Sequence, residues 1–224
     1  MTNNKYETRI VAYADILGWS GTIKNENQFN RLHKAVTSIA DHANSFSPDA
    51  KAEVKKCKVE PFIKKYESVE FSYFSDSLVI SVLPDYGEFL FKILSFSADA
   101  LLHERFLTRG GVTLGDLYHT NGVVFGPALN EAVEIEQKES MYPRFLCSQK
   151  LFKHLEERPY RDEVILQDCC QEWVVNIACG SLINRDNLMK IIRNESHKIE
   201  SAERKWRYIE TMLPKMFLVK SITQ

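Results

Sequence analysis

The chain has 224 residues, which is enough for one α/β or α+β domain with a sizeable hydrophobic core. Its 29 Lys and Arg residues nearly balance its 30 Asp and Glu residues, so bulk charge gives no reason to expect binding to nucleic acid or to a membrane surface. No apolar run approaches the ~20 residues that cross a bilayer, charged residues interrupt the N-terminus, and the five cysteines form no Cys-x-x-Cys pair; we therefore expect a cytoplasmic protein with reduced thiols and no secretory leader.

The first predicted strands each deliver an Asp to the end of an apolar run. Residues 7–15 are typical of a buried strand that ends at Asp15. Residues 67–74 and 77–83 predict a hairpin whose turn carries Asp76. An unpaired buried carboxylate is costly. Two Asp residues brought together by adjacent strands therefore indicate a site for hard cations such as Mg²⁺ or Mn²⁺.

The segment between these strands predicts a turn, a helix and a loop. Gly18 and Gly21 flank the turn, and the helix is expected over about 22–46. Residues 47–65 are rich in lysine, and a solvated surface loop is a better interpretation of them than a phosphate-binding arm. The predicted apolar face of the helix carries Phe29, Leu32, Val36, Ile39 and Ala43.

The middle of the chain predicts alternating helices and strands. The Asn121-Gly122 pair is typical of a tight hairpin turn, and Pro127 stands where a helix can begin. The predicted elements are a helix from Pro84 to about Arg105, a strand from Thr108 to Tyr118, a short strand from Val123 to Phe125, a helix from Gly126 that ends before Tyr142, a strand over 143–147, a short helix over 148–157 and two strands within 162–178.

The C-terminal region predicts one long amphipathic helix over 184–213 and a closing strand over 216–222. The helix would pack on its own domain or on a dimer partner, because its spacing is too irregular for a coiled coil. With no repeat or linker, residues 1–224 predict a single domain whose core covers about 7–180. The element order predicts an α+β, ferredoxin-like fold with a mostly antiparallel central sheet and helices on one face.

Four short motifs follow one another between residues 7 and 150. They contain Asp15 in Ala-Asp-Ile-Leu-Gly-Trp-Ser, Asp76 in Phe-Ser-Asp, Arg109 in Arg-Gly-Gly-Val-Thr-Leu-Gly and Asn130 in Gly-Pro-Ala-Leu-Asn-Glu-Ala. In this order they resemble four segments of class III nucleotidyl cyclases: the Asp-Ile-x-Gly-Phe-Ser/Thr motif, the hairpin with the second metal-binding Asp, the Arg-x-Gly-x-x-x-Gly strand and the Gly-x-x-Val-Asn-x-Ala helix start. Each motif alone is weakly specific, but four in order make the resemblance strong.

The resemblance implies a role for each matching residue. Asp15 and Asp76, with the main-chain carbonyl of Ile16, would hold two Mg²⁺ or Mn²⁺ ions per active site, and Asn130 would orient the ribose or the reacting phosphate. The ribose 3′-hydroxyl would attack the α-phosphorus and expel pyrophosphate, with Arg109 as a further catalytic residue. Backbone N–H groups at a helix start would bind the phosphates, from Leu17, Gly18, Trp19, Ser20 and Gly21.

Two departures from the family concern the base. Purine-specific members carry Lys or Glu four residues before the second Asp, where this chain has Ser72. They carry Asp or Cys seven residues before the helix Asn, where this chain has Val123. The chain therefore resembles most the pyrimidine cyclases of Pycsar bacterial antiphage systems, which make cyclic UMP or cyclic CMP for a downstream effector that senses the cyclic nucleotide. UTP is slightly favoured over CTP.

A third departure concerns the transition state. Purine cyclases usually carry Arg four residues after the helix Asn, and this position is Glu134 here. Loss of such an Arg costs ~10³-fold or more in phosphoryl chemistry. Either another cation compensates, with Arg109 and Arg144 as candidates, or the activity is low. Because the family builds its sites at a head-to-tail interface, the resemblance also implies a homodimer. From the balanced charge we expect no nucleic acid as partner and no direct membrane binding.

Alternative interpretations stay open. The chain could be a catalytically inactive, nucleotide-binding regulatory domain of the same fold, or a purine cyclase with unusual base contacts; a nucleic-acid-binding module is the weakest alternative. The candidate residues also have structural interpretations. Asp15 and Asp76 could cap turns, Asn130 could be an ordinary helix-start residue, Arg109 could form a surface salt bridge, and Trp19 is a better core anchor than base stacker.

Overall fold

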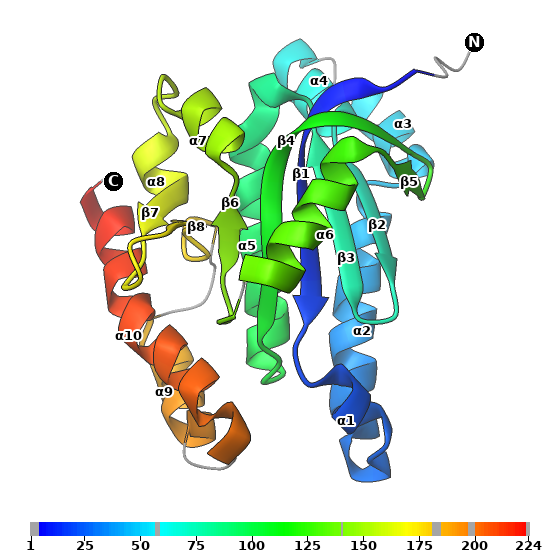
Figure 1. Cartoon of the computed structure of the whole chain (residues 1–224). Coiled ribbons are helices and arrows are strands. Elements are labelled where there is room, and N and C mark those ends of the chain that lie inside the picture. Colours follow the sequence, from blue (N-terminus) through cyan, green and yellow to red (C-terminus); the bar gives the residue numbers. More distant parts are fainter. Residues whose placement is uncertain (1–4, 57–58, 140, 181–184, 197–199, 223–224) are drawn as a thin grey trace.

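A mostly antiparallel sheet organises the chain in the computed structural model, which describes residues 5–56, 59–139, 141–180, 185–196 and 200–222 (Figure 1). The described strands follow the order β2-β3-β1-β4-β6-β8-β7, and β5 pairs with β4. Their bounds are β1 (Glu7–Ile16), β2 (Glu70–Phe74), β3 (Ser77–Val82), β4 (Thr108–Thr120), β5 (Val123–Phe125), β6 (Phe145–Cys147), β7 (Ile165–Gln167) and β8 (Trp173–Val175).

The first four sheet strands confirm the predicted ferredoxin-like order. Strands β4, β1, β3 and β2 are neighbours in that order, and each neighbouring pair is antiparallel. The alternation in β1 explains its central place, because Ile10 and Ala12 enter the main core while Val11 and Tyr13 face the other side. Strand β6 then adds to β4 in parallel.

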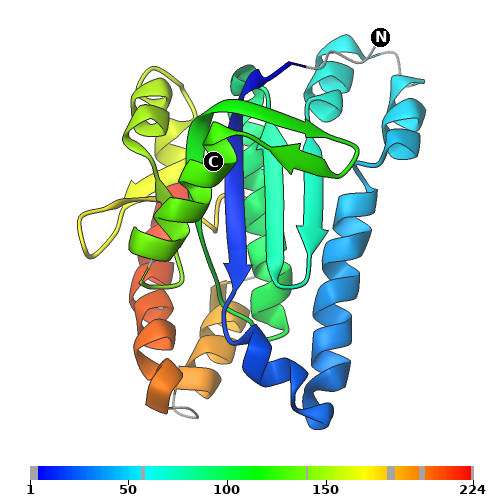
Figure 2. The ribbon, with the colours of Figure 1, turned by 45° about the vertical axis from the view of Figure 1, so that its right-hand side comes forward.

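Helices cover both faces of this sheet, whereas the sequence predicted them on one face. Helices α2 and α5 pack on the face of the main core, and α6 crosses the opposite face, as Figures 1 and 2 show. The helices and 3-10 turns are α1 (Trp19–Ile23), η1 (Glu26–Gln28), α2 (Phe29–Asn44), α3 (Pro48–Lys55), α4 (Glu60–Glu67), η2 (Pro84–Tyr86), α5 (Gly87–His103), α6 (Pro127–Glu139), α7 (Gln149–Leu155), α8 (Arg161–Val164), α9 (Arg185–Ser196) and α10 (Glu200–Ile222).

Glycine allows α6 to approach the sheet. A Cβ atom on Gly111 of β4 would lie 2.3 Å from the backbone oxygen of Ala132 in α6. The Gly-Gly pair of the third motif therefore has a packing role, since any side chain at 111 would push the helix away from the sheet. Small residues of α6, including Ala128 and Ala132, complete the contact with Val11 and Val79.

The prediction of a loop over 47–65 is wrong, because this segment forms α3 and α4. Ser47 caps α3 by accepting a hydrogen bond from the Ala50 amide, and a Pro follows it at the first turn. Helix α4 also has Pro in its first turn and carries lysines in its last turn, where they suit the helix dipole. Lys51, Lys55, Lys64 and Lys65 thus lie on short helices, and Lys51 pairs with Glu70 of β2 at 2.7 Å. Residues 57–58 lie outside the described ranges.

The C-terminal predictions need two corrections. The predicted single helix over 184–213 is the helix pair α9 and α10, which pack against each other; residues 184 and 197–199 lie outside the described part. The closing strand over 216–222 is also wrong, because α10 continues to Ile222. The buried residues Leu213 and Met216 follow helical spacing, so their apolar pattern continues the helix.

The predicted helix over 22–46 is shorter than expected. It is α2, and it begins at Phe29, after α1 and η1. Gly21 lies inside α1, so it does not flank a turn, whereas Gly18 does precede the helix.

In the described part, no helix combines the length and the apolar composition that a bilayer crossing needs. The four cysteines of this part are free thiols.

Candidate functional site

The two candidate carboxylates lie at the same end of the sheet. Asp15 is near the end of β1, opposite Ser77 of β3. Asp76 precedes Ser77 in the β2–β3 turn, and its carbonyl accepts a hydrogen bond from the Ile16 amide at 2.8 Å. The structure thus brings together Asp15, Asp76 and the main chain of Ile16, and strand pairing places them there.

The electrostatics of this end suit a cation. Burial raises the pKa of the Asp15 carboxyl, Arg109 opposes this rise, and the like charge of Asp76 adds to it. A positive ion between the two carboxylates would relieve both costs. Carboxylate and carbonyl oxygens are the ligands that Mg²⁺ and Mn²⁺ prefer, so the donor set fits these metals. Within the described ranges, no group of three or more His, Cys, Asp or Glu side chains is placed to hold a metal; a site here would need main-chain and substrate oxygens as well.

Arg109 links the carboxylate end of the sheet to α6. It stands directly opposite Asp15 in the β1–β4 register. Its Nε atom lies 3.5 Å from Asp15 Oδ2 and 2.5 Å from Oε1 of Glu136. Burial raises the pKa of Glu136, Arg109 opposes that rise and Asp15 adds to it. Arg109 is half-buried and lies between the carboxylates of Asp15 and Glu136. In this position it holds the Asp15 side chain in place.

Glu136 lies beside the candidate carboxylates, and no role was predicted for it from the sequence. Its side chain is 4% exposed, although α6 carries other acidic residues in solvent. Its position four residues after the buried Ala132 was the available signal, because residues four apart share a helix face. A single acidic residue on an apolar helix face rarely lacks a buried cation as partner.

The predicted phosphate-binding segment follows Asp15 directly. Gly18 has φ 81° and precedes the five-residue helix α1; other residues are strained in that conformation. Trp19 is buried in the main core and Ser20 is exposed. Trp19 is thus a core anchor, as its apolar character suggested, and its contribution to a ligand would come from its main chain.

Asn130 and Val123 do not lie with the carboxylates. Asn130 is exposed near the start of α6, and six residues of helix separate it from Glu136, which corresponds to about 9 Å along the axis. Val123 is 55% exposed at the start of β5, where it pairs with Thr120 at the far end of β4 from Arg109. Glu134, at the position of the family's Arg, is exposed and lies 3.4 Å from Lys138.

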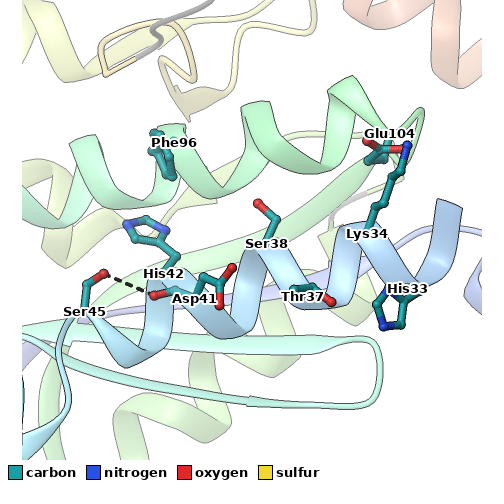
Figure 3. Close-up of a pocket in the computed structure, with 9 residues that line it drawn as sticks. All are labelled: His33, Lys34, Thr37, Ser38, Asp41, His42, Ser45, Phe96 and Glu104. Atoms are coloured by element: carbon teal, nitrogen blue, oxygen red, sulfur yellow. Dashed lines mark hydrogen bonds between the residues drawn. The ribbon is translucent and has the colours of Figure 1, made fainter. Parts of the chain in front are cut away.

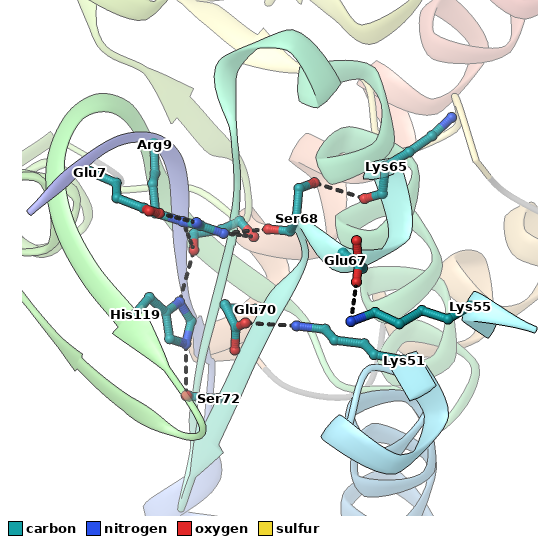
Figure 4. A network of polar contacts seen from close by, with 11 residues as sticks. Glu7, Arg9, Lys51, Lys55, Lys65, Glu67, Ser68, Glu70, Ser72 and His119 are labelled. Carbon is teal, nitrogen blue, oxygen red and sulfur yellow. Dashed lines mark hydrogen bonds and ion pairs between the residues drawn. The ribbon is translucent and has the colours of Figure 1, made fainter. Parts of the chain in front are cut away.

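Ser72 belongs to a buried polar network (Figure 4). Its hydroxyl lies 2.9 Å from Nε2 of His119, and Nδ1 of His119 lies 2.9 Å from the hydroxyl of Ser81. Arg9 donates from Nε to the same Ser81 hydroxyl at 2.9 Å and also binds the Ser68 carbonyl. The Ser72 hydroxyl thus has a partner in its own chain, which the sequence could not show because His119 is 47 residues away.

This network predicts a loss of stability in acid. Burial, helped by Arg9 and Lys51, lowers the pKa of His119 to about 3. The unfolded chain binds the proton near the ordinary value of 6.5, so stability is lost as the pH falls below that value. Between pH 7 and pH 5 this His should remove about 2 kcal/mol of unfolding free energy. Urea unfolding at both pH values should therefore show a smaller acid loss for His119→Asn than for the wild type, by about that amount.

The exposed His33 provides the control for this measurement. His33→Asn should keep the full acid loss of the wild type. An equal acid loss in His119→Asn and in the wild type would contradict the neutral, hydrogen-bonded state of His119 in the folded protein.

A cavity of about 720 Å³ lies between α2 and α5 (Figure 3). It is on the face opposite α6, and none of the predicted site residues lines it. His42 lies on its wall, 3.1 Å from the Ser97 hydroxyl, and burial lowers the pKa of His42 to about 4. The residues of the four motifs therefore point to the charged end of the sheet and not to this cavity.

Comparison with known proteins finds a shared fold. No protein-family model matches the chain, and no curated protein sequence does. Among solved structures, the adenylyl cyclase CyaB from P. aeruginosa superposes with a TM-score of 0.52 and 12% identity, over 76% of this chain and 94% of that chain. This likeness confirms the predicted class III nucleotidyl cyclase fold.

Two further structures give lower scores. The catalytic core of a rhodopsin-guanylyl cyclase with converted specificity, in complex with ATPαS, has a TM-score of 0.48 and 13% identity, over 77% of this chain and 97% of that chain. A bacterial light-regulated adenylyl cyclase also has a TM-score of 0.48, with 15% identity, over 85% of this chain and 98% of that chain.

Proposed function

We propose that this chain is a pyrimidine nucleotide cyclase, which converts UTP or CTP to the 3′,5′-cyclic nucleotide and pyrophosphate. The observation that carries the proposal is the meeting of Asp15 and Asp76 at one end of a sheet with the class III cyclase fold. The proposal takes residues 1–224 as a single cytoplasmic domain. It assigns the cyclic product to a bacterial antiphage signal that a downstream effector senses, as in Pycsar systems.

The residues divide the chemistry among themselves. Asp15, Asp76 and the carbonyl of Ile16 would hold two Mg²⁺ or Mn²⁺ ions. When bound, such ions favour ionisation of the ribose 3′-hydroxyl and neutralise charge on the triphosphate. Arg109 would keep the Asp15 carboxylate oriented from its position between Asp15 and Glu136. Main-chain N–H groups of residues 17–21 would bind phosphate oxygens.

The position of Asn130 supports a site shared by two protomers. In one chain, Asn130 is exposed and lies away from the Asp15 end of α6. A homodimer could supply this group to the carboxylates from the second copy. Each active site would then combine Asp15 and Asp76 of one protomer with Asn130 of the partner subunit, with two such sites per dimer.

We expect UTP or CTP to be cyclised with kcat/KM at least about tenfold above ATP and GTP. The Ser72 hydroxyl is held by His119 and Val123 offers no polar atom, so neither position supplies a partner for the polar edge of a purine. An unpaired buried polar group costs ~1–3 kcal/mol, and about 1.4 kcal/mol corresponds to one decade. To test this, the protein is incubated with Mn²⁺ and each of the four nucleoside triphosphates in turn. The cyclic products are then identified and quantified by mass spectrometry.

Equal or faster turnover of ATP would refute the pyrimidine assignment and leave the cyclase proposal standing.

A second function is favoured by one observation: Glu134, at the position of the family's Arg, is a carboxylate that faces Lys138. The chain would then be an inactive nucleotide-binding domain. Nucleotide binding without any cyclic product, under the same conditions, would establish that alternative.

A further inference from the structure

A groove of about 470 Å³ opens beside the loop that follows β1. One wall contains Leu17, Gly18 and Gly21, and the opposite wall contains Lys205 and Trp206 of α10. Figures 1 and 2 show α1 and the start of α10 at the same end of the molecule. The C-terminal helix α10 thus reaches the predicted phosphate-binding segment.

Positive charge dominates this groove. Its lining includes the cations Arg31, Arg105 and Lys205 and the single carboxylate Glu195. The Nε atom of Arg105 lies 3.3 Å from Glu195, and the Arg105 side chain is 48% exposed. Arg31 donates to the carbonyls of Glu104 and Arg105 at 2.9–3.2 Å, so it fixes the turn that carries Arg105. The groove therefore has an excess of positive charge on a well-defined backbone.

Lys205 is the cation with the most freedom to bind a ligand. It is half-buried, and within the described ranges it has no hydrogen bond or ion pair. Lys205 lines the groove beside Leu17 and Gly18, which follow Asp15 in the chain, and its positive charge acts on the Asp15 carboxylate. A half-buried lysine that lines a groove and has no hydrogen bond or ion pair there is suited to an anionic ligand.

Core packing of neighbouring residues of α10 holds Lys205 in place. Trp206, Ile209 and Met212 are buried in the main core. The Tyr208 hydroxyl donates to Asp168 at 2.8 Å, and its ring stacks on Tyr142 with 5.0 Å between centroids. The position of Lys205 is therefore set by packing of the whole helix, as a preorganised binding group requires.

We propose that this groove binds the polyphosphate chain of the nucleoside triphosphate and that Lys205 binds its terminal phosphates. The proposal rests on the cyclase function above and extends it to the C-terminal helices. In the reaction, the 3′-oxygen forms a bond to the α-phosphorus while the bond from that phosphorus to the bridging oxygen breaks. The 3′-hydroxyl proton leaves to solvent, and pyrophosphate leaves with the electron pair. Lys205 stabilises this charge, which Glu134 cannot do.

The test measures binding of inorganic tripolyphosphate by titration calorimetry, in buffer with Mg²⁺, and needs no turnover. Lys205→Gln should weaken this binding at least about tenfold, because a charge-assisted hydrogen bond is lost. Arg204→Gln is the matched control, since it removes one positive charge from an adjacent, exposed position that does not line the groove; it should change binding less than about twofold. Arg105→Gln should weaken binding in the same direction as Lys205→Gln. Thermal unfolding verifies that all three variants fold.

Competition then identifies the source of the polyphosphate. Nucleoside triphosphates should displace tripolyphosphate from the wild type, and displacement by none of the four would refute a nucleotide in the groove. Equal affinity of Lys205→Gln and the wild type for tripolyphosphate would overturn the proposal even if the protein cyclises UTP. Lys205-dependent binding in a protein without cyclase activity would leave the groove standing and remove the cyclase function. The two proposals can therefore fail separately.

Discussion

Asp76→Ala should lower the rate of nucleotide cyclisation at least about 10³-fold while the protein stays folded. Asp76 lies in a turn, and its main-chain carbonyl accepts a hydrogen bond from the Ile16 amide. This main-chain hydrogen bond does not need the Asp76 side chain. Loss of the carboxylate removes half of the acidic pair that would hold the metals. It also removes a like charge that raises the pKa of Asp15, so the metal-free variant should unfold at the same temperature as the wild type or higher.

The opposite end of the same strand offers a control. Asp85 follows β3, its side chain is 83% exposed, and it lies 3.5 Å from Arg158. Asp85→Ala should keep full activity, because it removes a similar charge far from Asp15. Single-turnover rates with saturating Mn²⁺, measured together with thermal unfolding, separate lost chemistry from lost folding. Normal turnover by a folded Asp76→Ala protein would refute the two-metal proposal.

The central part of the fold could be predicted because its signals are local. The apolar run of β1 and the apolar residues of β3 mark buried strands, and Asn121-Gly122 marks a turn with positive φ at both residues. The same signals placed Asp15 and Asp76 at strand ends, from which their approach follows by pairing. The failures have local causes too: the lysines of 51–65 outweighed the cap at Ser47, and a short apolar pattern near Met216 fitted strand and helix equally well.

The rest of the site could not be predicted because it depends on contacts between distant residues. Glu136 meets Arg109 only after α6 packs on the sheet. His119 meets Ser72 only after β4 continues beyond β1 toward the β5 hairpin. Lys205 reaches the groove only through the docking of α10. No period along the chain encodes these encounters, and a charged residue on a surface helix gives no sign that its position is functional.

Two inactive variants should complement each other if two protomers share their active sites. Asp15→Ala and Asn130→Ala should each be nearly inactive alone, yet an equal mixture should regain about a quarter of wild-type activity. Random exchange makes half of the dimers mixed, and one of the two sites in each mixed dimer has all its groups. The structural reason is the position of Asn130 on α6. Glu136, which contacts Arg109 beside Asp15, lies six positions further along this helix. One protomer therefore does not bring Asn130 and Asp15 to the same place.

A second mixture makes the test specific. Asp15→Ala with Asp76→Ala should show no recovery, because both carboxylates come from the same protomer and every site in a mixed dimer lacks one of them. Subunit exchange is measured independently by native mass spectrometry of the same mixtures. Recovery in both mixtures would argue against the assignment of Asp15 and Asp76 to one site. Recovery in neither, with exchange demonstrated, would mean that Asn130 acts within its own protomer or has no part in catalysis.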